Sequence, residues 1–125
     1  LPQQVSALLY AAARQGGGIP TQAALAASLD IPFSTFRRQL AEAGASFRQL
    51  REACLKDVAQ RLLRNGNMTV TETAIHLGFA DTAAFRHAFV RWTGQSPRLW
   101  QQHQAHPTQY LSNNGAPFTS RPNRN

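Results

Sequence analysis

Two short segments of the chain carry side chains suited to binding a charged or polar partner. Arg37 and Arg38 stand together in the first half of the sequence, and Arg86 stands beside His87 in the second. Thirteen Lys and Arg against six Asp and Glu give a net charge of +7, and every basic residue except Lys56 is arginine. The planar guanidinium presents a fork of donors that fits phosphate groups and the edge of guanine. The charge therefore favours a nucleic acid, while an anionic membrane surface and a basic protein without such a partner remain open.

The sequence contains no arrangement of residues for bond-breaking chemistry. None of its four histidines belongs to an H-E-x-x-H pattern, and its six carboxylates are scattered along the chain. The run Gly16-Gly17-Gly18 lacks the Lys and the Ser or Thr that follow in a phosphate-binding loop. Cys54 is the single cysteine, which excludes an internal disulfide and a Cys-based zinc site. We therefore expect a protein that is not an enzyme and that needs no cofactor and no metal.

The composition predicts a chain with its own apolar core and no membrane span. Hydrophobic residues make up 42% of the chain, and no apolar run reaches the length of about 18 residues that a transmembrane helix needs. The opening Leu1-Pro2-Gln3-Gln4 has neither the basic nor the apolar region of a signal peptide, so we expect a cytoplasmic protein. The chain also lacks an initiator Met, and we expect it to be a fragment of a longer protein.

Helical periodicity covers most of the chain, and no strand alternation of any length is present. Thr21, Ser46, Thr71 and Asp81 are suited to cap helix starts, and Asp30 is suited to a left-handed turn. The expected helices are 5–14, 21–28, 34–43, 47–64, 71–77 and 82–93, followed by a short helix that Ser96-Pro97 opens. From His103 onward the polar composition predicts a tail with little order.

The apolar and aromatic side chains are expected to form a core rather than a surface for stacking bases. Cys54 falls on the apolar face of helix 47–64 and is expected to be a buried small hydrophobe, not a redox switch. The aromatic residues assigned to the core are Phe36, Phe79, Phe85, Phe89, Trp92 and Trp100.

Two segments of the chain share one order of residues. Ala26, Leu29, Ile31, Phe36 and Leu40 recur as Ala74, Leu77, Phe79, Phe85 and Phe89, with an offset of 48 for the first three and 49 for the last two. A small alanine lets two helices cross closely, a turn residue reverses the chain, and the next apolar residue fills the angle between the helices. The pattern therefore predicts two helix-turn-helix units, each with basic residues on the outward face of its second helix.

A long helix joins the two expected units. Residues 47–64 number 18, which gives a helix of about 27 Å at about 1.5 Å per residue. Successive major-groove segments lie about 34 Å apart along one side of B-DNA. The linker helix and its flanking turns therefore predict a separation at which both units reach the same duplex.

The stretch VTETAIHLGFADTAAFRHAFVRWTGQSPRLW, from Val70 to Trp100, resembles the signature of the AraC/XylS family of transcription regulators. The Ala-x-x-x-Gly-Phe core, the Phe-x-x-x-Phe pair, the end at Trp92-Thr93-Gly94 and the start at Ser96-Pro97 carry this resemblance. The segment from Ala26 to Gly44 is similar to the family's first and more variable unit, and the whole resemblance covers about residues 5–101.

The resemblance implies an all-α domain of about seven helices, with two helix-turn-helix subdomains joined by a long linker helix. It implies sequence-specific binding of promoter or operator DNA, with the second helix of each unit in one of two adjacent major-groove segments. It further implies a bacterial regulator, usually an activator, that works with RNA polymerase and carries a separate N-terminal effector or dimerisation domain. The residues that the resemblance assigns to DNA are Ser34, Thr35, Arg37, Arg38, Thr82, Ala83, Arg86 and His87.

These positions have expected roles and stated alternatives. Base-edge contacts are expected first from the arginines, whereas hydroxyls at helix starts suit phosphates as well as simple capping. Arg48, Arg51, Arg61, Arg64 and Arg98 are assigned to the solvated surface rather than to phosphate contacts.

The chain departs from the family pattern in the turn of each unit, and it has a small residue at the start of the second recognition helix. Pro32-Phe33 stands where the family usually has Ser followed by Pro, and Ala80 stands where Ser is common. Ala83 is small, so it suits a methyl contact or no contact.

The expected division of the chain is a first helix-turn-helix subdomain at 1–46, a linker helix at 47–65, a second subdomain at 66–102 and a polar, disordered tail at 103–125. The alternative to a DNA-binding domain is a helical protein-interaction module whose basic face meets an acidic partner.

Overall fold

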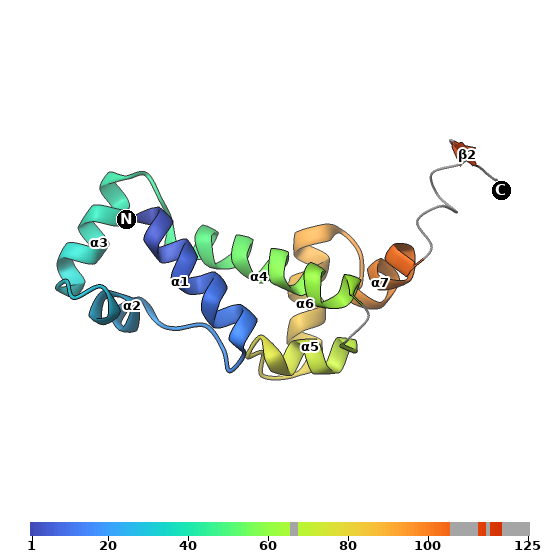
Figure 1. The fold of residues 1–125 in the computed structure, drawn as a ribbon, viewed down its shortest axis with the longest axis horizontal. Coiled ribbons are helices and arrows are strands. Elements are labelled where there is room, and N and C mark those ends of the chain that lie inside the picture. The colour runs from blue at the N-terminus through green and yellow to red at the C-terminus, as the bar shows by residue number, and fades with distance from the viewer. Residues whose placement is uncertain (66–67, 106–112, 115, 119–125) are drawn as a thin grey trace.

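The computed structural model describes residues 1–65, 68–105, 113–114 and 116–118, and most of them are helical. The helices are α1 (Pro2–Gln15), α2 (Gln22–Ser28), α3 (Phe33–Glu42), α4 (Phe47–Arg64), α5 (Val70–His76), α6 (Thr82–Thr93) and α7 (Pro97–Ala105). In Figure 1, α1 to α3 form one end of an elongated molecule, α5 to α7 form the other, and α4 runs between them. This arrangement confirms the predicted all-α fold of two helix-turn-helix units and one linker helix.

The end of the chain differs in detail from the predicted tail. The helix α7 continues to Ala105, so residues 103–105 are helical rather than part of a tail. Two short strands, β1 (Asn113–Asn114) and β2 (Ala116–Phe118), pair antiparallel. The rest of the predicted disordered tail lies outside the described residues. None of the helices in the described ranges is long and apolar enough to cross a membrane.

Capping side chains place three helix starts where the sequence predicts them. The side chains of Thr21, Ser46 and Asp81 each accept a hydrogen bond from the backbone N–H three residues later. The first helix begins earlier than predicted, because Pro2 occupies the first helical turn, where its fixed φ is favourable. The predicted cap at Thr71 is wrong. Thr69 caps α5 and forms a reciprocal capping box with Glu72, so Thr71 lies inside the helix.

The two helix-turn-helix turns have the same backbone hydrogen bonds, as the sequence repeat requires. The Ile31 N–H donates to the Ala26 carbonyl at 3.1 Å, and the Phe79 N–H donates to the Ala74 carbonyl at 3.0 Å. Asp30 has φ 59° and Gly78 has φ 87°, which confirms the left-handed turn predicted at the first position. Ala26 and Ala74 are both buried, so each alanine lies where two helices cross.

One continuous core runs through both halves of the molecule. The linker α4 contributes Cys54, Leu55, Val58, Ala59 and Leu63, and all of them belong to a single cluster of buried side chains. Helix α1 packs along α4, and its buried residues join the same cluster. The expected aromatic core is confirmed at Phe36, Phe85, Phe89 and Trp100, whereas Phe79 and Trp92 are partly buried against it. Since α4 belongs to the core of both units, neither unit is packed independently of the other.

The thiol of Cys54 is buried among apolar side chains, which confirms its assignment as a core residue. Burial raises the pKa of Cys54 from 9.0 to about 11, and the negative charge of Asp57 adds to the rise. Since the thiolate is the reactive form, we expect a disulfide reagent at pH 8 to modify Cys54 only after the protein has unfolded. The native protein should react roughly a hundredfold more slowly than the urea-unfolded protein, as followed by the absorbance of the released thiol. Equal rates in the two states would contradict the burial of this residue.

Candidate nucleic-acid interface

The outward face of α3 presents the predicted residues of the first unit. Ser34, Arg37 and Arg38 are exposed and Thr35 is half-buried. Phe36 and Leu40 face the core from the other side of the same helix, with no more than 4% of either exposed. This division follows from the 3.6-residue period, because residues 36 and 40 share a face that excludes 34, 37 and 38.

Both arginines of α3 have only weak contacts within the protein. The Nε of Arg38 lies 3.8 Å from the Glu42 carboxylate, and the side chains are 61% and 67% exposed, so the pair contributes little to stability. The guanidinium carbon of Arg37 lies 5.8 Å from the centre of the Phe33 ring. Phe33 is absent from the residues predicted from the sequence, although an aromatic residue four positions before an arginine on a helix is a readable signal.

The N-terminal half of α6 presents the predicted residues of the second unit. Arg86 and His87 are exposed, whereas Thr82 and Ala83 are half-buried. The Asp81 carboxylate accepts a hydrogen bond of 2.7 Å from the Ala84 N–H and so fixes the start of this helix. Phe85 and Phe89 hold the opposite face in the core, which leaves residues 86 and 87 directed outward. The two sets of candidate residues thus lie on two separate helices, α3 in the first unit and α6 in the second (Figure 1).

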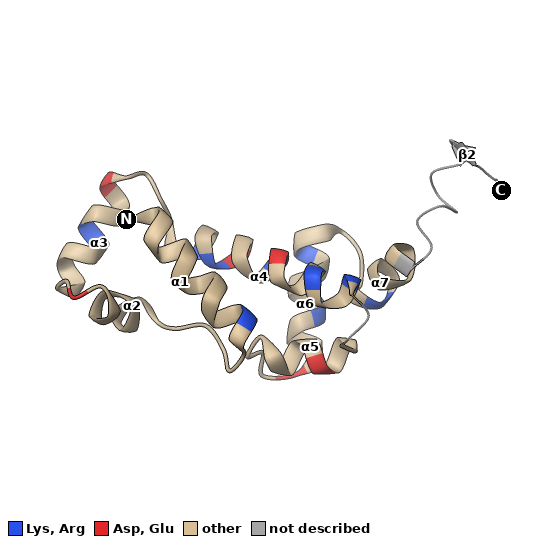
Figure 2. Ribbon diagram, viewed as in Figure 1, with Lys and Arg blue, Asp and Glu red and all other residues tan. Residues whose placement is uncertain are grey.

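Four acidic residues are engaged within the protein, and a fifth, Glu42, lies beside Arg38 on α3. Glu72 and Asp81 cap helices, and Glu52 and Asp57 pair with arginines of α4 and α6. Figure 2 shows basic residues on α1, α3, α4, α6 and α7, with the acidic residues dispersed among the elements. Within the described ranges, no ion pair involves Arg37, Arg86 or His87, and no group of three or more His, Cys, Asp or Glu is placed to hold a metal ion.

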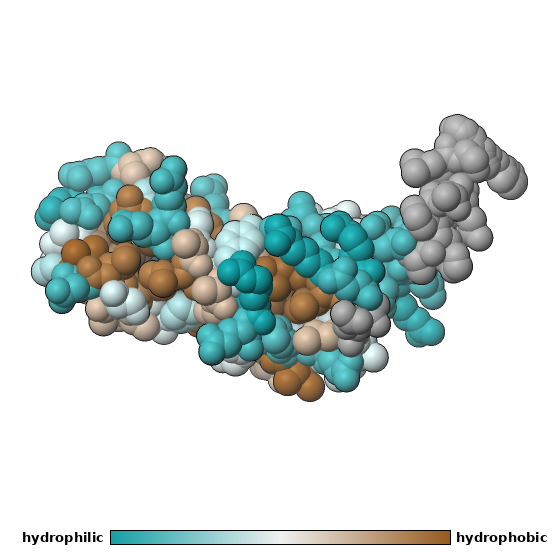
Figure 3. Space-filling view, viewed as in Figure 1, coloured by the Kyte–Doolittle hydropathy of each residue, from teal (hydrophilic) through white to brown (hydrophobic). Residues whose placement is uncertain are grey.

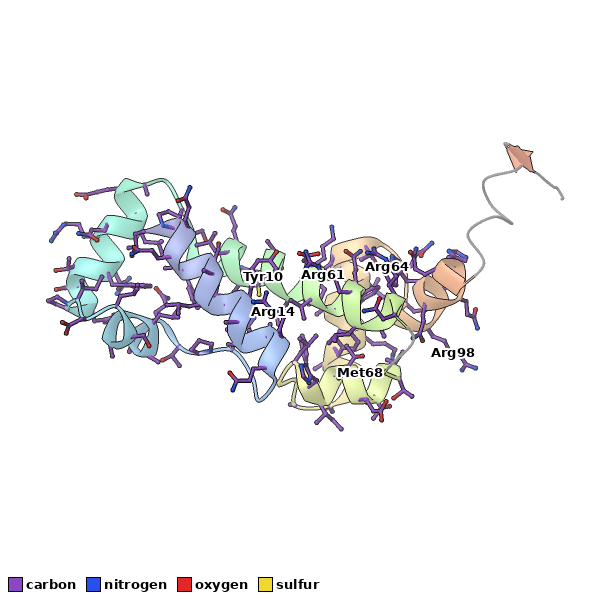
Figure 4. All side chains as sticks on the ribbon, viewed as in Figure 1. Tyr10, Arg14, Arg61, Arg64, Met68 and Arg98 are labelled. Atoms are coloured by element: carbon purple, nitrogen blue, oxygen red, sulfur yellow. The ribbon has the colours of Figure 1, made fainter. Side chains whose placement is uncertain are left out.

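Three of the arginines assigned from the sequence to the solvated surface contact other side chains of the protein. Arg48 and Arg61 form ion pairs with carboxylates four residues away, and the guanidinium of Arg64 lies 5.6 Å from the centre of the Trp100 ring. In Figure 4, Arg61 and Arg64 lie along α4, and Arg98 extends from α7 toward solvent. Figure 3 shows many hydrophilic side chains over this part of the molecule, and hydrophobic patches both at the end formed by α1, α2 and α3 and in the half formed by α4, α5 and α6.

The carboxylate of Glu52 connects the linker helix to the last turn of α6. One oxygen accepts a hydrogen bond of 3.2 Å from the Trp92 indole N–H, and the other lies 3.4 Å from Arg91 and 3.5 Å from Arg48. Partial burial alone would raise the pKa of Glu52. The hydrogen bond from Trp92 and the charge of Arg91 outweigh it and lower the pKa from its ordinary value of 4.5. These contacts hold the C-terminal end of α6, whereas the candidate residues stand at its N-terminal half.

Glu52→Gln is expected to reduce the loss in the free energy of unfolding that the protein shows on acidification. Because the folded-state pKa is lowered, the stabilisation by ionised Glu52 is present above pH 4.5 and is lost as the pH falls through the lowered value. Urea unfolding at pH 7 and at pH 3.5 should show a smaller difference in free energy for the variant than for the unsubstituted protein. An equal difference in both proteins would show that Glu52 is not coupled to these partners.

The first and second helix-turn-helix units also touch each other at the loop after α1 (Figure 1). The His76 imidazole donates through Nε2 to the Arg14 carbonyl at 2.9 Å, and the Gly17 N–H donates to the His76 carbonyl at 3.2 Å. Gly18 lies so close to Gly78 that a Cβ built on Gly78 would stand 2.5 Å from the Gly18 Cα. The sequence predicts these glycines only as turn residues or helix stops. In the structure they fix the first unit against the turn of the second.

Comparison with known proteins gives one consistent result. Residues 25–103 match a family model described as a helix-turn-helix domain. The chain is 43% identical over 84 residues to an uncharacterised HTH-type transcriptional regulator of Mycobacterium tuberculosis, a match that covers 67% of this chain and 24% of that relative. The chain therefore spans about a quarter of the length of this relative.

Solved structures agree with the family match. The transcriptional regulator CdpR from Pseudomonas aeruginosa is similar with a TM-score of 0.70 and 37% identity, over 81% of this chain and 31% of that one. A regulator from Chromobacterium violaceum, described among AraC-type DNA-binding domain-containing proteins, is similar with a TM-score of 0.68, over 84% of this chain and 95% of that one. Its identity of 12% shows the fold alone.

Proposed function

The chain belongs to the AraC-type helix-turn-helix family of DNA-binding transcription regulators, and we propose that α3 and α6 enter two adjacent major-groove segments of one double-stranded DNA site. The observation that carries this proposal is the pair of outward surfaces on α3 and α6, one in each unit. Each bears at least one exposed arginine that makes no ion pair within the described residues, Arg37 on α3 and Arg86 on α6. Such guanidinium groups gain bonding partners when they meet phosphates or base edges.

The spacing of the two surfaces supports simultaneous binding. With 18 residues, α4 is about 27 Å long, and it lies between α3, which precedes its start, and α6, whose last turn contacts it at Glu52. The contacts of Glu52 with α6 and of the Gly16–Gly18 region with α5 restrict changes in this separation. A preorganised separation lowers the entropy that binding would otherwise cost.

Within this geometry each candidate residue has a proposed role. Arg37, Arg38 and Arg86 are assigned to base edges, with His87 beside them in the second segment. Ser34, Thr35 and Thr82 stand at the starts of α3 and α6, where hydroxyls and backbone N–H groups suit phosphates. Ala83 suits a thymine methyl group. The proposed subdomains are residues 1–46 and 66–102, on either side of the linker helix at 47–65.

The role of the whole protein is proposed from the family. We infer regulation of bacterial promoters, activation rather than repression, and contact with RNA polymerase. A separate effector or dimerisation domain belongs to the same proposal. Since bacterial promoters lie in the cytoplasm, the protein is placed there, and it acts by binding rather than by catalysis.

Selection of bound fragments from a random pool of duplex DNA is the direct test. We expect one enriched site with two half-sites about one helical turn apart, and a weaker, salt-dependent affinity for all other DNA. If no sequence is enriched at moderate salt, the DNA-binding proposal fails, and the basic surface belongs to a protein-interaction module instead.

Arg38→Ala is expected to reduce affinity for the selected site roughly tenfold to a hundredfold, because a bidentate arginine contributes on the order of 1–3 kcal/mol of base discrimination. Affinity for random DNA should fall much less. Arg51→Ala, which removes an exposed arginine of α4, is the matched control and should change the two affinities by similar, small factors. Gel-shift titrations on both DNAs give the comparison. Equal losses on both DNAs for Arg38→Ala would reassign this residue to a phosphate.

A further inference from the structure

We propose that Phe33 and Arg37 form one composite surface for two neighbouring base pairs, in which the Phe33 ring contacts a thymine methyl group and Arg37 bonds to the adjacent guanine. This inference rests on the proposed function, because it requires α3 to lie in the major groove. Phe33 lies outside the set of residues assigned to DNA from the sequence.

The exposure of Phe33 is the first observation behind this proposal. Phe33 is the first residue of α3 and is 44% exposed, whereas Phe36, Phe85 and Phe89 are completely buried. Within the described ranges, the other large hydrophobic side chains with such exposure are aliphatic. A half-exposed ring at the start of a helix adds less to the core than a buried one, and it leaves an apolar surface free to contact a partner.

The second observation is the position of Arg37 relative to this ring. Arg37 stands one helical turn after Phe33, and side chains on a helix lean toward its N-terminus. Its guanidinium carbon therefore reaches 5.8 Å from the ring centre, within the range of a cation–π contact. This contact restricts the rotamers of Arg37 before any partner binds, so less conformational entropy is lost on binding.

The chemistry of the major groove matches the pair. The N-terminal residues of a recognition helix face base edges, and base pairs follow one another at about 3.4 Å. A guanidinium stacked over a ring therefore presents its donors at one base pair and the apolar ring at the next. Guanine offers two acceptors that suit arginine, and the thymine methyl is the apolar group that phenylalanine contacts in this groove. A thymine beside a guanine is thus the ligand that both side chains fit together.

Replacement of single thymines by uracil tests this inference, because it removes only the methyl group. The selected duplex is prepared with uracil at one position at a time and is bound to the full chain. At the thymine beside the guanine that Arg37→Ala no longer distinguishes, we expect the affinity of the unsubstituted protein to fall about fourfold. Phe33→Ala should bind the two duplexes equally.

Two further variants make the result decisive. Leu99→Ala removes an apolar side chain of matched exposure, 43%, from α7 and should keep the full methyl effect. Phe33→Gln provides a second test if Phe33→Ala does not fold, and it should also lose the effect. If uracil costs the same affinity in the unsubstituted protein and in the Phe33 variants, the inference is overturned while sequence-specific binding stands. A failure to enrich any site would instead overturn the proposed function.

Discussion

Phe89→Ala is expected to reduce the free energy of unfolding by about 3–5 kcal/mol, the usual cost of truncating a buried aromatic side chain. Phe89 is completely buried, and its ring centre lies 5.8 Å from that of Phe85, 6.3 Å from that of Trp92 and 5.7 Å from that of Trp100. Since domains of this size are stable by only about 5–15 kcal/mol, this single change should remove a large part of the stability of the protein and weaken DNA binding at 37 °C.

The continuous core also predicts that both units of this variant unfold together. Trp92 and Trp100 both lie in the second unit, so tryptophan fluorescence reports on that unit, while far-UV circular dichroism reports on all helices. We expect the two signals to unfold in one coincident transition in urea, because α4 belongs to the core of both units. The matched control for Phe89→Ala is Val90→Ala, which changes the neighbouring, 45% exposed residue and should reduce the free energy of unfolding by less than about 1 kcal/mol. Two separated transitions would show that the units fold independently.

Gly78→Ala is expected to cost about 2–4 kcal/mol, because strain in the left-handed region adds to a collision between the two halves. Gly78 has φ 87°, and its new Cβ would lie 2.5 Å from the Cα of Gly18, which belongs to the backbone and cannot rotate away. The variant must therefore move the turn of the second unit away from the loop after α1.

Gly94→Ala is the matched control for this prediction. Gly94 has φ 82°, close to that of Gly78, and nothing lies within 4 Å of the point that a Cβ would occupy there, so it should show the backbone strain alone, about 1–2 kcal/mol. The difference between the two variants in urea unfolding measures the collision. Gly78→Ala should also bind the selected DNA less tightly than Gly94→Ala when both are folded, since only the former displaces α6 from its place relative to α3. Equal losses of stability in the two variants would show that the halves do not touch at Gly78.

Local features of the fold could be predicted from the sequence because their causes lie within a few residues. Ser46 and Asp81 predict their helix starts, and Asp30 predicts a left-handed turn. The prediction of a cap at Thr71 is wrong, although the spacing of Thr69 and Glu72 is that of a capping box. The sequence therefore contains the capping signal, but Thr69 and Thr71 are both residues suited to cap this helix.

Contacts between distant parts of the chain could not be predicted in the same way. Glu52 and Trp92 are 40 residues apart, and Arg14 and His76 are 62 apart, so no periodicity connects them. The glycines at 16–18 are readable as a helix stop, but their close approach to Gly78 depends on how the two units pack. For the candidate interface, the repeat predicts which helices carry the outward residues, whereas Phe33 was not among the predicted residues, although its spacing of four from Arg37 is visible in the sequence.

The uninterrupted linker helix also limits how relatives of this chain can diverge. Because an α-helix turns about 100° per residue, one residue inserted into α4 would rotate the second unit by about that angle and move it only about 1.5 Å along the axis. The two recognition helices would then face different sides of the duplex. Changes in operator geometry across such proteins should therefore arise through substitutions on α3 and α6 or through length changes in the turns, while the number of residues in this helix stays constant.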